Sequence, residues 1–330
     1  STLIMYWSQV RVLAGPPFIS YMKTIICTTP IDHLKGLKEI LKKKGKLIYK
    51  PKINGEQLKQ LLKKNKKINV IFCNPNRQGY ILNKRILSTS SIKIINTAST
   101  GLNHINLYDC EKLGIKIFSL TKDKNLIKLL PSTSELAIGL MIDLLRNITK
   151  SFNSVKNKEW DYLNFIGQEL ASLTIGIIGL GRLGRLMAKF AKSFGMNVLY
   201  YDPFVNSKNY KKTNLKQLIK VSDVISIHVH VSQKTKYMIN KKILKFAKNR
   251  PVIINTSRGE IVNEKDIIWG LKNKFISGYG TDVIETEFSD LKKSPIIKNI
   301  NNYNILVTPH IGGMTLQGQL RAFKFAIEKF

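Results

Sequence analysis

A glycine-rich turn between an apolar run and an amphipathic stretch constrains this 330-residue chain more than any other feature. In TIGIIGLGRLGRLMAKFAKSFG, Gly179, Gly181 and Gly184 follow the apolar run, and the apolar residues after them recur at helical spacing. Glycines here permit a tight turn, a close approach of backbone to a pyrophosphate, and close packing of helix on strand. The stretch therefore predicts a parallel-sheet domain that binds a dinucleotide at a helix N-terminus.

Asp202 indicates which dinucleotide this is. It follows the next apolar run, NVLYY, at the spacing where a carboxylate accepts hydrogen bonds from the adenosine ribose. A carboxylate at that point repels a 2′-phosphate, so the sequence favours NAD over NADP.

Short β-branched runs alternate with amphipathic stretches along nearly the whole chain, which is typical of parallel sheets wrapped by helices. The length also favours two domains. We therefore predict an α/β protein with two doubly wound parallel-sheet domains. A flavodoxin-like substrate domain would comprise residues 22–123 plus 311–330, and a Rossmann NAD-binding domain residues 124–310. Residues 1–21 are expected to form an N-terminal extension outside the fold.

The charge of the chain is strongly positive, with 54 Lys and Arg against 21 Asp and Glu, which gives a net charge of +33. The lysines are spread among many Ile and Asn residues, and all three amino acids have AT-rich codons. Base composition therefore explains the excess about as well as an anionic partner does. Because no arginine-rich tract, zinc-finger spacing or aromatic RNA-binding motif accompanies the charge, we expect no specific nucleic-acid partner.

The cysteines Cys27, Cys73 and Cys110 are odd in number and form no CxxC pair, so neither a disulfide framework nor a metal site is predicted. They suit a reducing cytoplasm. No apolar run reaches membrane-spanning length, and residues 1–21 lack the features of a signal peptide. His33 and His104 are interpreted as surface residues, since neither has a second ligand at metal-binding spacing.

Three ionisable residues stand at or just beyond the ends of predicted strands. They are Arg258 in NTSRGE, Glu287 in GTDVIETE and His310 in VTPHIGG. Ligands of open α/β sheets bind beyond the carboxyl ends of the strands, so all three should face one crevice. Each has a simpler interpretation alone, as a surface ion pair, a solvated loop charge or a helix cap.

The motifs GIIGLGRLGRLMAKF, SIHVHVSQKTKYMIN, INTSRGEIVNEKDI, GYGTDVIETE and VTPHIGG occur in that order. With them the chain resembles, from Met22 to its end, the D-isomer-specific 2-hydroxyacid dehydrogenases, a family that includes phosphoglycerate, glycerate and D-lactate dehydrogenases. The resemblance implies NAD as cofactor and Arg258, Glu287 and His310 as catalytic groups. It also implies a homodimer, for which the apolar helix ELAIGLMIDLL is our predicted interface. The positions it matches to NAD contacts are Arg182, Leu183, Asp202, Thr256, Ser257 and Asp282.

The chemistry of a 2-hydroxy acid suits these residues. His310 is the natural base for the hydroxyl proton, because imidazole titrates near neutral pH. Glu287 would fix the ring tautomer and favour the protonated form that a 2-keto acid needs for reduction. Arg258 offers a planar cation to the carboxylate and to the developing alkoxide. Gly312 and Gly313 would let the backbone pass close to the cofactor.

The substrate side of the site is less constrained. In NTASTGLNHINL, Ser99, Thr100 and Gly101 match a turn whose backbone N–H groups bind the substrate carboxylate in the family. The alternative is a simple strand-to-helix turn capped by Asn103 or Asn106.

The loop CNPNRQGY contains one cation, Arg77, which either faces the substrate or is a solvated loop residue. One guanidinium among amides favours a small polar acid such as glycerate over 3-phosphoglycerate.

Two further features remain open. Alternation in SIHVHV would place His228 and His230 on one strand face beside the adenine pocket, with metal binding as a weaker alternative. The rival function is a regulatory, corepressor-like module that binds NAD without turning over a substrate.

Overall fold

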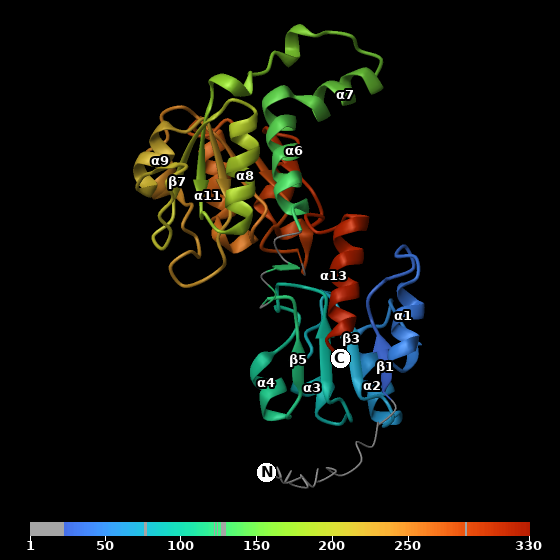
Figure 1. The fold of residues 1–330 in the computed structure, drawn as a ribbon. Helices are drawn as coiled ribbons and strands as arrows, with labels where there is room; N and C mark the ends of the chain where they lie inside the picture. Colours follow the sequence, from blue (N-terminus) through green and yellow to red (C-terminus); the bar gives the residue numbers. More distant parts are fainter. Residues whose placement is uncertain (1–22, 76–77, 122, 124, 127–129, 288) are drawn as a thin grey trace, which may run out of the picture.

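The computed structural model describes residues 23–75, 78–121, 123, 125–126, 130–287 and 289–330. The predicted extension 1–21 lies outside the described residues. The chain forms two α/β lobes, and helix α13 at its C-terminal end packs on the first lobe (Figure 1). No helix in the part of the chain that the structure describes is long and apolar enough to cross a membrane.

The first sheet has five parallel strands in the order β2-β1-β3-β4-β5, which is the flavodoxin-like order. β1 and β3 are buried at every position, which explains their uninterrupted apolar sequences. The strands are β1 Thr24–Cys27, β2 Lys46–Tyr49, β3 Val70–Cys73, β4 Ile94–Thr97 and β5 Lys116–Phe118.

Helix α13 completes the core of the first lobe, although it lies far away in sequence. Phe323 packs edge-on against Phe72 of β3, with ring centroids 5.7 Å apart. Asn96 of β4 donates from Nδ2 to the carbonyl of Ala326 at 2.7 Å. The helices of this lobe are α1 Leu37–Lys44, α2 Gly55–Lys64, α3 Lys84–Leu87, α4 Leu107–Lys112 and α13 Leu316–Glu328.

The second sheet has seven parallel strands in the order β12-β11-β10-β9-β6-β7-β8, a Rossmann order extended by one strand. Six of these strands have three to five residues each. The seventh, β8, has only the residues Lys211–Lys212 and gives no apolar signal. The order reverses between β6 and β9, where such sheets bind dinucleotides. The other strands are β6 Thr174–Ile178, β7 Asn197–Tyr201, β9 Val224–Ile227, β10 Val252–Asn255, β11 Gly278–Thr281 and β12 Ile305–Val307.

Helices cover both faces of this sheet. α6 and α8 share one apolar cluster, and α9, α10 and α11 share the cluster on the opposite face. The helices are α6 Ser132–Arg146, α7 Ile148–Lys156, α8 Arg182–Ser193, α9 Leu215–Val221, α10 Lys241–Leu244, α11 Glu264–Lys272 and α12 Pro295–Lys298. Short 3-10 turns are η1 Leu163–Phe165, η2 Leu170–Ser172, η3 Gly259–Ile261 and η4 Leu291–Lys293.

Candidate active site

The glycine turn between β6 and α8 has the form that a pyrophosphate requires. Gly179 has a φ of +89°, and a Cβ on it would lie 2.6 Å from the carbonyl oxygen of His228. A Cβ on Gly184 would lie 2.0 Å from the carbonyl oxygen of Gly179, so the helix packs directly on the turn. Among the residues that the structure describes, a Cβ on Gly181 would meet nothing within 4 Å, and no side chain caps the N-terminus of α8. Open space in front of free N–H groups fits a bound pyrophosphate.

Asp202 is held beside this turn by backbone groups. Its Oδ2 accepts from the N–H of Leu180 and its Oδ1 from the N–H of Phe204, both at 2.8 Å. Each carboxylate oxygen retains the capacity to accept another hydrogen bond. The fixed carboxylate therefore suits a ribose diol, as the sequence predicts.

Arg182 and Leu183 connect the glycine turn to neighbouring segments. Arg182 donates from Nη1 to the carbonyl of Leu130 at 2.5 Å. The carbonyl of Leu183 accepts from the hydroxyl of Ser134 in α6 at 3.0 Å. The predicted cofactor-contacting positions are thus tied to the segment that links the two lobes.

Three more of the predicted cofactor positions follow β10 and β11. Thr256 is buried, and Ser257 donates from its hydroxyl to the carbonyl of Ile227 at 2.7 Å. Asp282 directly follows β11 and is 2% exposed. All three therefore lie at the carboxyl edge of the second sheet, on strands neighbouring its switch point.

The carboxylate of Asp282 organises the turn that carries His310. Its Oδ1 accepts from the hydroxyl of Thr308 at 2.6 Å and from the N–H of Ile311 at 2.7 Å. Its Oδ2 accepts from the N–H of Gly312, also at 2.7 Å. His310 itself has a φ of 55°, a left-handed conformation that is uncommon outside glycine. Asp282 therefore stabilises the backbone turn that points the imidazole into the cleft.

The two adjacent glycines differ in what surrounds them. A Cβ on Gly312 would lie 3.0 Å from Oδ2 of Asp282, so this glycine permits the close turn around the carboxylate. A Cβ on Gly313 would meet nothing within 4 Å among the described residues. The space in front of Gly313 is compatible with the predicted approach of a cofactor.

His310 and Glu287 form a hydrogen-bonded pair. Nδ1 of His310 lies 2.9 Å from Oε2 of Glu287, and the side chains are 40% and 18% exposed respectively. The hydrogen bond to Glu287 raises the pKa of His310, against the opposing effect of burial. Because Nδ1 is engaged, Nε2 is the ring nitrogen left for a substrate.

Arg258 reaches from the second lobe toward the turn after β4. Its Nη1 donates to the carbonyl of Ser257 at 2.6 Å. A Cβ on Gly101 would lie 2.6 Å from Nη2 of Arg258, so this glycine leaves room for the guanidinium. A Cβ on Gly259 would lie 2.3 Å from the carbonyl carbon of Ile284, which lets the arginine loop pack tightly. Small residues on both sides thus place Arg258 between the lobes.

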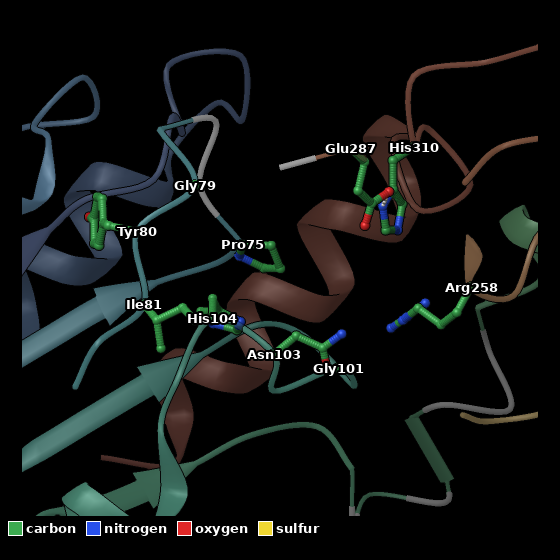
Figure 2. A pocket seen from close by; sticks show the side chains of 10 residues that line it. All are labelled: Pro75, Gly79, Tyr80, Ile81, Gly101, Asn103, His104, Arg258, Glu287 and His310. Carbon is green, nitrogen blue, oxygen red and sulfur yellow. Dashed lines mark hydrogen bonds and ion pairs between the residues drawn. The ribbon is translucent and has the colours of Figure 1, made fainter. Parts of the chain in front are cut away.

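A cavity of about 110 Å³ lies where these groups meet, and both lobes contribute to its walls (Figure 2). The second lobe provides the three predicted catalytic groups, and the first provides the opposite wall. The described residues that line it are Pro75, Gly79, Tyr80, Ile81, Gly101, Asn103, His104, Arg258, Glu287 and His310.

The predicted carboxylate turn enters this cavity only through Gly101. The N–H of Gly101 donates to the hydroxyl oxygen of Ser99 at 3.1 Å, and the carbonyl of Thr100 accepts from Thr121. Neither Ser99 nor Thr100 belongs to the described lining. Arg77 lies outside the described residues. The turn therefore positions Gly101, while the neighbouring hydroxyl occupies its N–H.

The interpretation of His104 as a surface residue was wrong. It is 6% exposed and lines the cavity, with Nε2 lying 3.1 Å from the hydroxyl of Thr97. Burial lowers the pKa of His104 to about 4, so the ring is neutral near pH 7. Together with Pro75, Tyr80 and Asn103 it forms a wall that local sequence patterns did not reveal, because only folding brings these loops together.

The prediction that His228 and His230 share one strand face stays a prediction. β9 ends at Ile227, and the N–H of the next residue, His228, donates to the carbonyl of Ile178 at 2.7 Å. His228 is half-buried, with Nε2 lying 2.8 Å from the hydroxyl of Ser226, and burial lowers its pKa to about 4. His230 is exposed.

Comparison with known proteins places this geometry in a family. Residues 138–312 match the model of the D-isomer specific 2-hydroxyacid dehydrogenase, NAD binding domain. A D-3-phosphoglycerate dehydrogenase of Methanocaldococcus jannaschii is 30% identical over 93% of this chain and 57% of its own length. A hydroxypyruvate reductase of Thermotoga maritima is 32% identical over 72% of this chain and 76% of its own length.

A solved structure agrees with the match. D-lactate dehydrogenase from Aquifex aeolicus, complexed with NAD and lactic acid, superposes with a TM-score of 0.76 at 27% identity, covering 93% of this chain and 94% of that one. The chain therefore belongs to the D-isomer specific 2-hydroxyacid dehydrogenase family, and its dinucleotide is NAD. The chain spans about half the length of the phosphoglycerate dehydrogenases that it matches.

Proposed function

We propose that the protein is an NAD-dependent D-2-hydroxyacid dehydrogenase that interconverts a small 2-hydroxy acid and its 2-keto acid. One observation carries the proposal. His310 is hydrogen-bonded to Glu287 and shares a cavity with Arg258, at the carboxyl edge of the sheet that bears the glycine turn. An acid–base pair and a fixed cation beside a dinucleotide site are the groups that this reaction requires.

Arg258 binds and orients the substrate in this proposal. Its guanidinium pairs with the carboxylate and donates to the keto oxygen, which gains negative charge during reduction. The carbonyl of Ser257 holds Nη1 of the same guanidinium, which limits its movement. Gly101 closes the opposite side without a side chain that would displace the arginine.

His310 moves the proton. In reduction the protonated ring donates from Nε2 to the keto oxygen, and in oxidation the neutral ring accepts the hydroxyl proton at the same atom. Glu287 keeps the proton of Nδ1 in place and favours the cationic ring. The turn held by Asp282 keeps the imidazole directed into the cavity.

NAD, when bound, supplies the hydride acceptor for oxidation, and its reduced form supplies the hydride for reduction. The chain's residues would hold it along the carboxyl edge of the second sheet, with the adenosine ribose at the carboxylate of Asp202. The residues we assign to this surface are Gly179, Gly181, Arg182, Leu183, Gly184, Asp202, Thr256, Ser257, Asp282, Gly312 and Gly313.

Turnover of NADH with a panel of 2-keto acids tests the function. We expect oxidation of NADH with at least one acid. We also expect a loss of roughly 10²- to 10⁴-fold in turnover in His310→Gln, the contribution of general acid–base catalysis. NADH affinity, followed by the quenching of protein fluorescence, should change little in that variant. Near-normal turnover in His310→Gln would refute the assignment.

The rival function, an NAD-binding regulatory module, does not require the acid–base pair. It predicts saturable NADH binding with no oxidation of NADH by any acid. The gathering of Arg258, Glu287 and His310 around one cavity favours the enzyme.

A cytoplasmic location suits the three cysteines, all of which are buried and unpaired.

The quaternary state that we propose is a homodimer, but through a surface other than the predicted helix. The apolar side of α6 packs within its own domain, through Ala137, Leu140 and Met141 among others. The segment after α6 instead projects from the second lobe (Figure 1). Its apolar side chains, which are between 50% and 86% exposed, are Ile148, Phe152, Val155, Trp160, Tyr162, Leu163 and Ile166.

A second copy of the chain would cover this segment, because exposed apolar area of this extent is typical of association sites. Sedimentation velocity at micromolar concentration should give a dimer, and Phe152→Glu should shift it toward monomer. A monomeric unaltered protein at that concentration would contradict the proposal.

A further inference from the structure

Among the described residues, Asn103 has no structural partner that accounts for its position. Figure 2 shows its carboxamide extending from the turn after Gly101 into the gap that Arg258 faces from the other side. Its side chain is exposed and makes no hydrogen bond to any residue that the structure describes. Asn106, three residues further on, differs, because its Oδ1 accepts from the N–H of Asp109 at 3.0 Å and caps α4. The helix needs only one of the two asparagines.

The rest of the first-lobe wall carries no charge among the described residues. Pro75 and Ile81 present apolar surface, and Ile81 is 47% exposed at the cavity. The ring of His104 is buried, with Nε2 hydrogen-bonded to the hydroxyl of Thr97. In the described lining, Arg258 is the only residue with a permanent positive charge, and the proposed mechanism uses it for the carboxylate.

The size of the cavity restricts the substrate further. The space that the described residues line has a volume of about 110 Å³. Carboxylate, keto carbon and a short side chain fill such a space. A phosphorylated side chain would bring a second anionic group to a wall without a described cation, and burying an unpaired charge is costly.

We propose, on the basis of the dehydrogenase function above, that the substrate has a short uncharged side chain with a hydroxyl on C3, the chemistry of hydroxypyruvate and glycerate. Asn103 is the residue that determines this specificity. A carboxamide offers an acceptor and two donors, so it pairs with a hydroxyl in either direction. The carboxamide forms no hydrogen bond with a methyl group. When an acid with a methyl side chain binds, the polar atoms of the carboxamide therefore lose water without gaining a partner.

The test compares kcat/KM for hydroxypyruvate, pyruvate and phosphohydroxypyruvate in the unaltered protein, Asn103→Ala and Asn106→Ala. The unaltered protein should prefer hydroxypyruvate over both other acids. In Asn103→Ala the ratio of hydroxypyruvate to pyruvate should fall about three- to tenfold, the value of one neutral hydrogen bond. Asn106→Ala removes the same side chain from a helix cap, so it should lower the melting temperature and leave the ratio unchanged.

Several results would overturn the inference. An unchanged ratio in Asn103→Ala, with both acids turned over, removes Asn103 from the substrate site. A preference of the unaltered protein for phosphohydroxypyruvate, abolished in Arg77→Ala, shows that a cation outside the described residues sets the specificity. No oxidation of NADH with any acid refutes the dehydrogenase function itself and the inference with it, whereas a changed preference in an active enzyme separates the two.

Discussion

Replacing Gly101 with alanine tests how closely the two lobes approach at the active site. The new Cβ would lie 2.6 Å from Nη2 of Arg258, whereas ordinary contact begins at 3.4 Å. The guanidinium must therefore retreat by about 0.8 Å, and it can do so because it is the end of a flexible side chain. The expected result is a folded protein whose Arg258 no longer meets the substrate correctly.

The magnitude follows from that displacement. A misplacement of about 1 Å costs up to roughly 10²-fold in rate, so we expect kcat/KM for the 2-keto acid to fall by roughly 10- to 100-fold. Initial rates of NADH oxidation measure this effect, and thermal unfolding followed by circular dichroism measures stability. The melting temperature should stay within a few degrees, because the atom that the new Cβ meets most closely is the end of a flexible side chain.

Gly139→Ala is the matched control for this substitution. Gly139 lies exposed in α6, and a Cβ on it meets none of the described residues within 4 Å. Alanine there should slightly stabilise the helix and leave kcat/KM unchanged. If Gly101→Ala kept full activity, Arg258 would not be held where the described contacts place it, and its proposed role would be refuted.

Three further substitutions test other groups of the site. Reduction of a 2-keto acid needs protonated His310, so kcat/KM should be constant at low pH and fall as the pH rises through the raised pKa of His310. Glu287→Gln removes the group that raises this pKa, so it should move the fall in kcat/KM to lower pH. An unchanged pH profile in that variant would contradict the pairing of His310 with Glu287. Asp202→Ala should narrow the preference for NADH over NADPH, and equal use of both by the unaltered enzyme would contradict the ribose assignment. Asp282→Ala leaves buried donors unpaired, at about 1–3 kcal/mol each, so urea unfolding should show a clear loss of stability together with lost turnover.

Local sequence determined the class of fold of this protein and predicted its candidate reactive groups. Continuous β-branched runs have to be buried on both faces, so they indicated parallel sheets directly. The glycine turn was readable because its three glycines are required by contacts within the turn itself, as at Gly179 and Gly184. Arg258, Glu287 and His310 stand out because strand ends of a parallel sheet lie at one edge whatever the loops do.

Tertiary structure alone decided the environment of the other groups. The residues near His104 in sequence do not predict its burial. That burial depends on the loops after β3 and β4, which meet around the ring. The burial of His228 likewise depends on its packing beside β6, since its N–H donates to the carbonyl of Ile178. Burial and register are set by residues distant along the chain, and periodicity within a short window does not carry that information.

The walls of the cavity show the same division. The sequence offered Asn103 and Asn106 as equivalent caps, and only the arrangement of α4 assigns the cap to Asn106 and leaves Asn103 to the cleft. Likewise Gly101 could be placed in a turn from sequence, whereas its contact with Arg258 requires the two lobes to be assembled. The sequence gives the chemistry of each reactive side chain directly. The neighbours of that side chain depend on how separate elements pack, which only the folded chain determines.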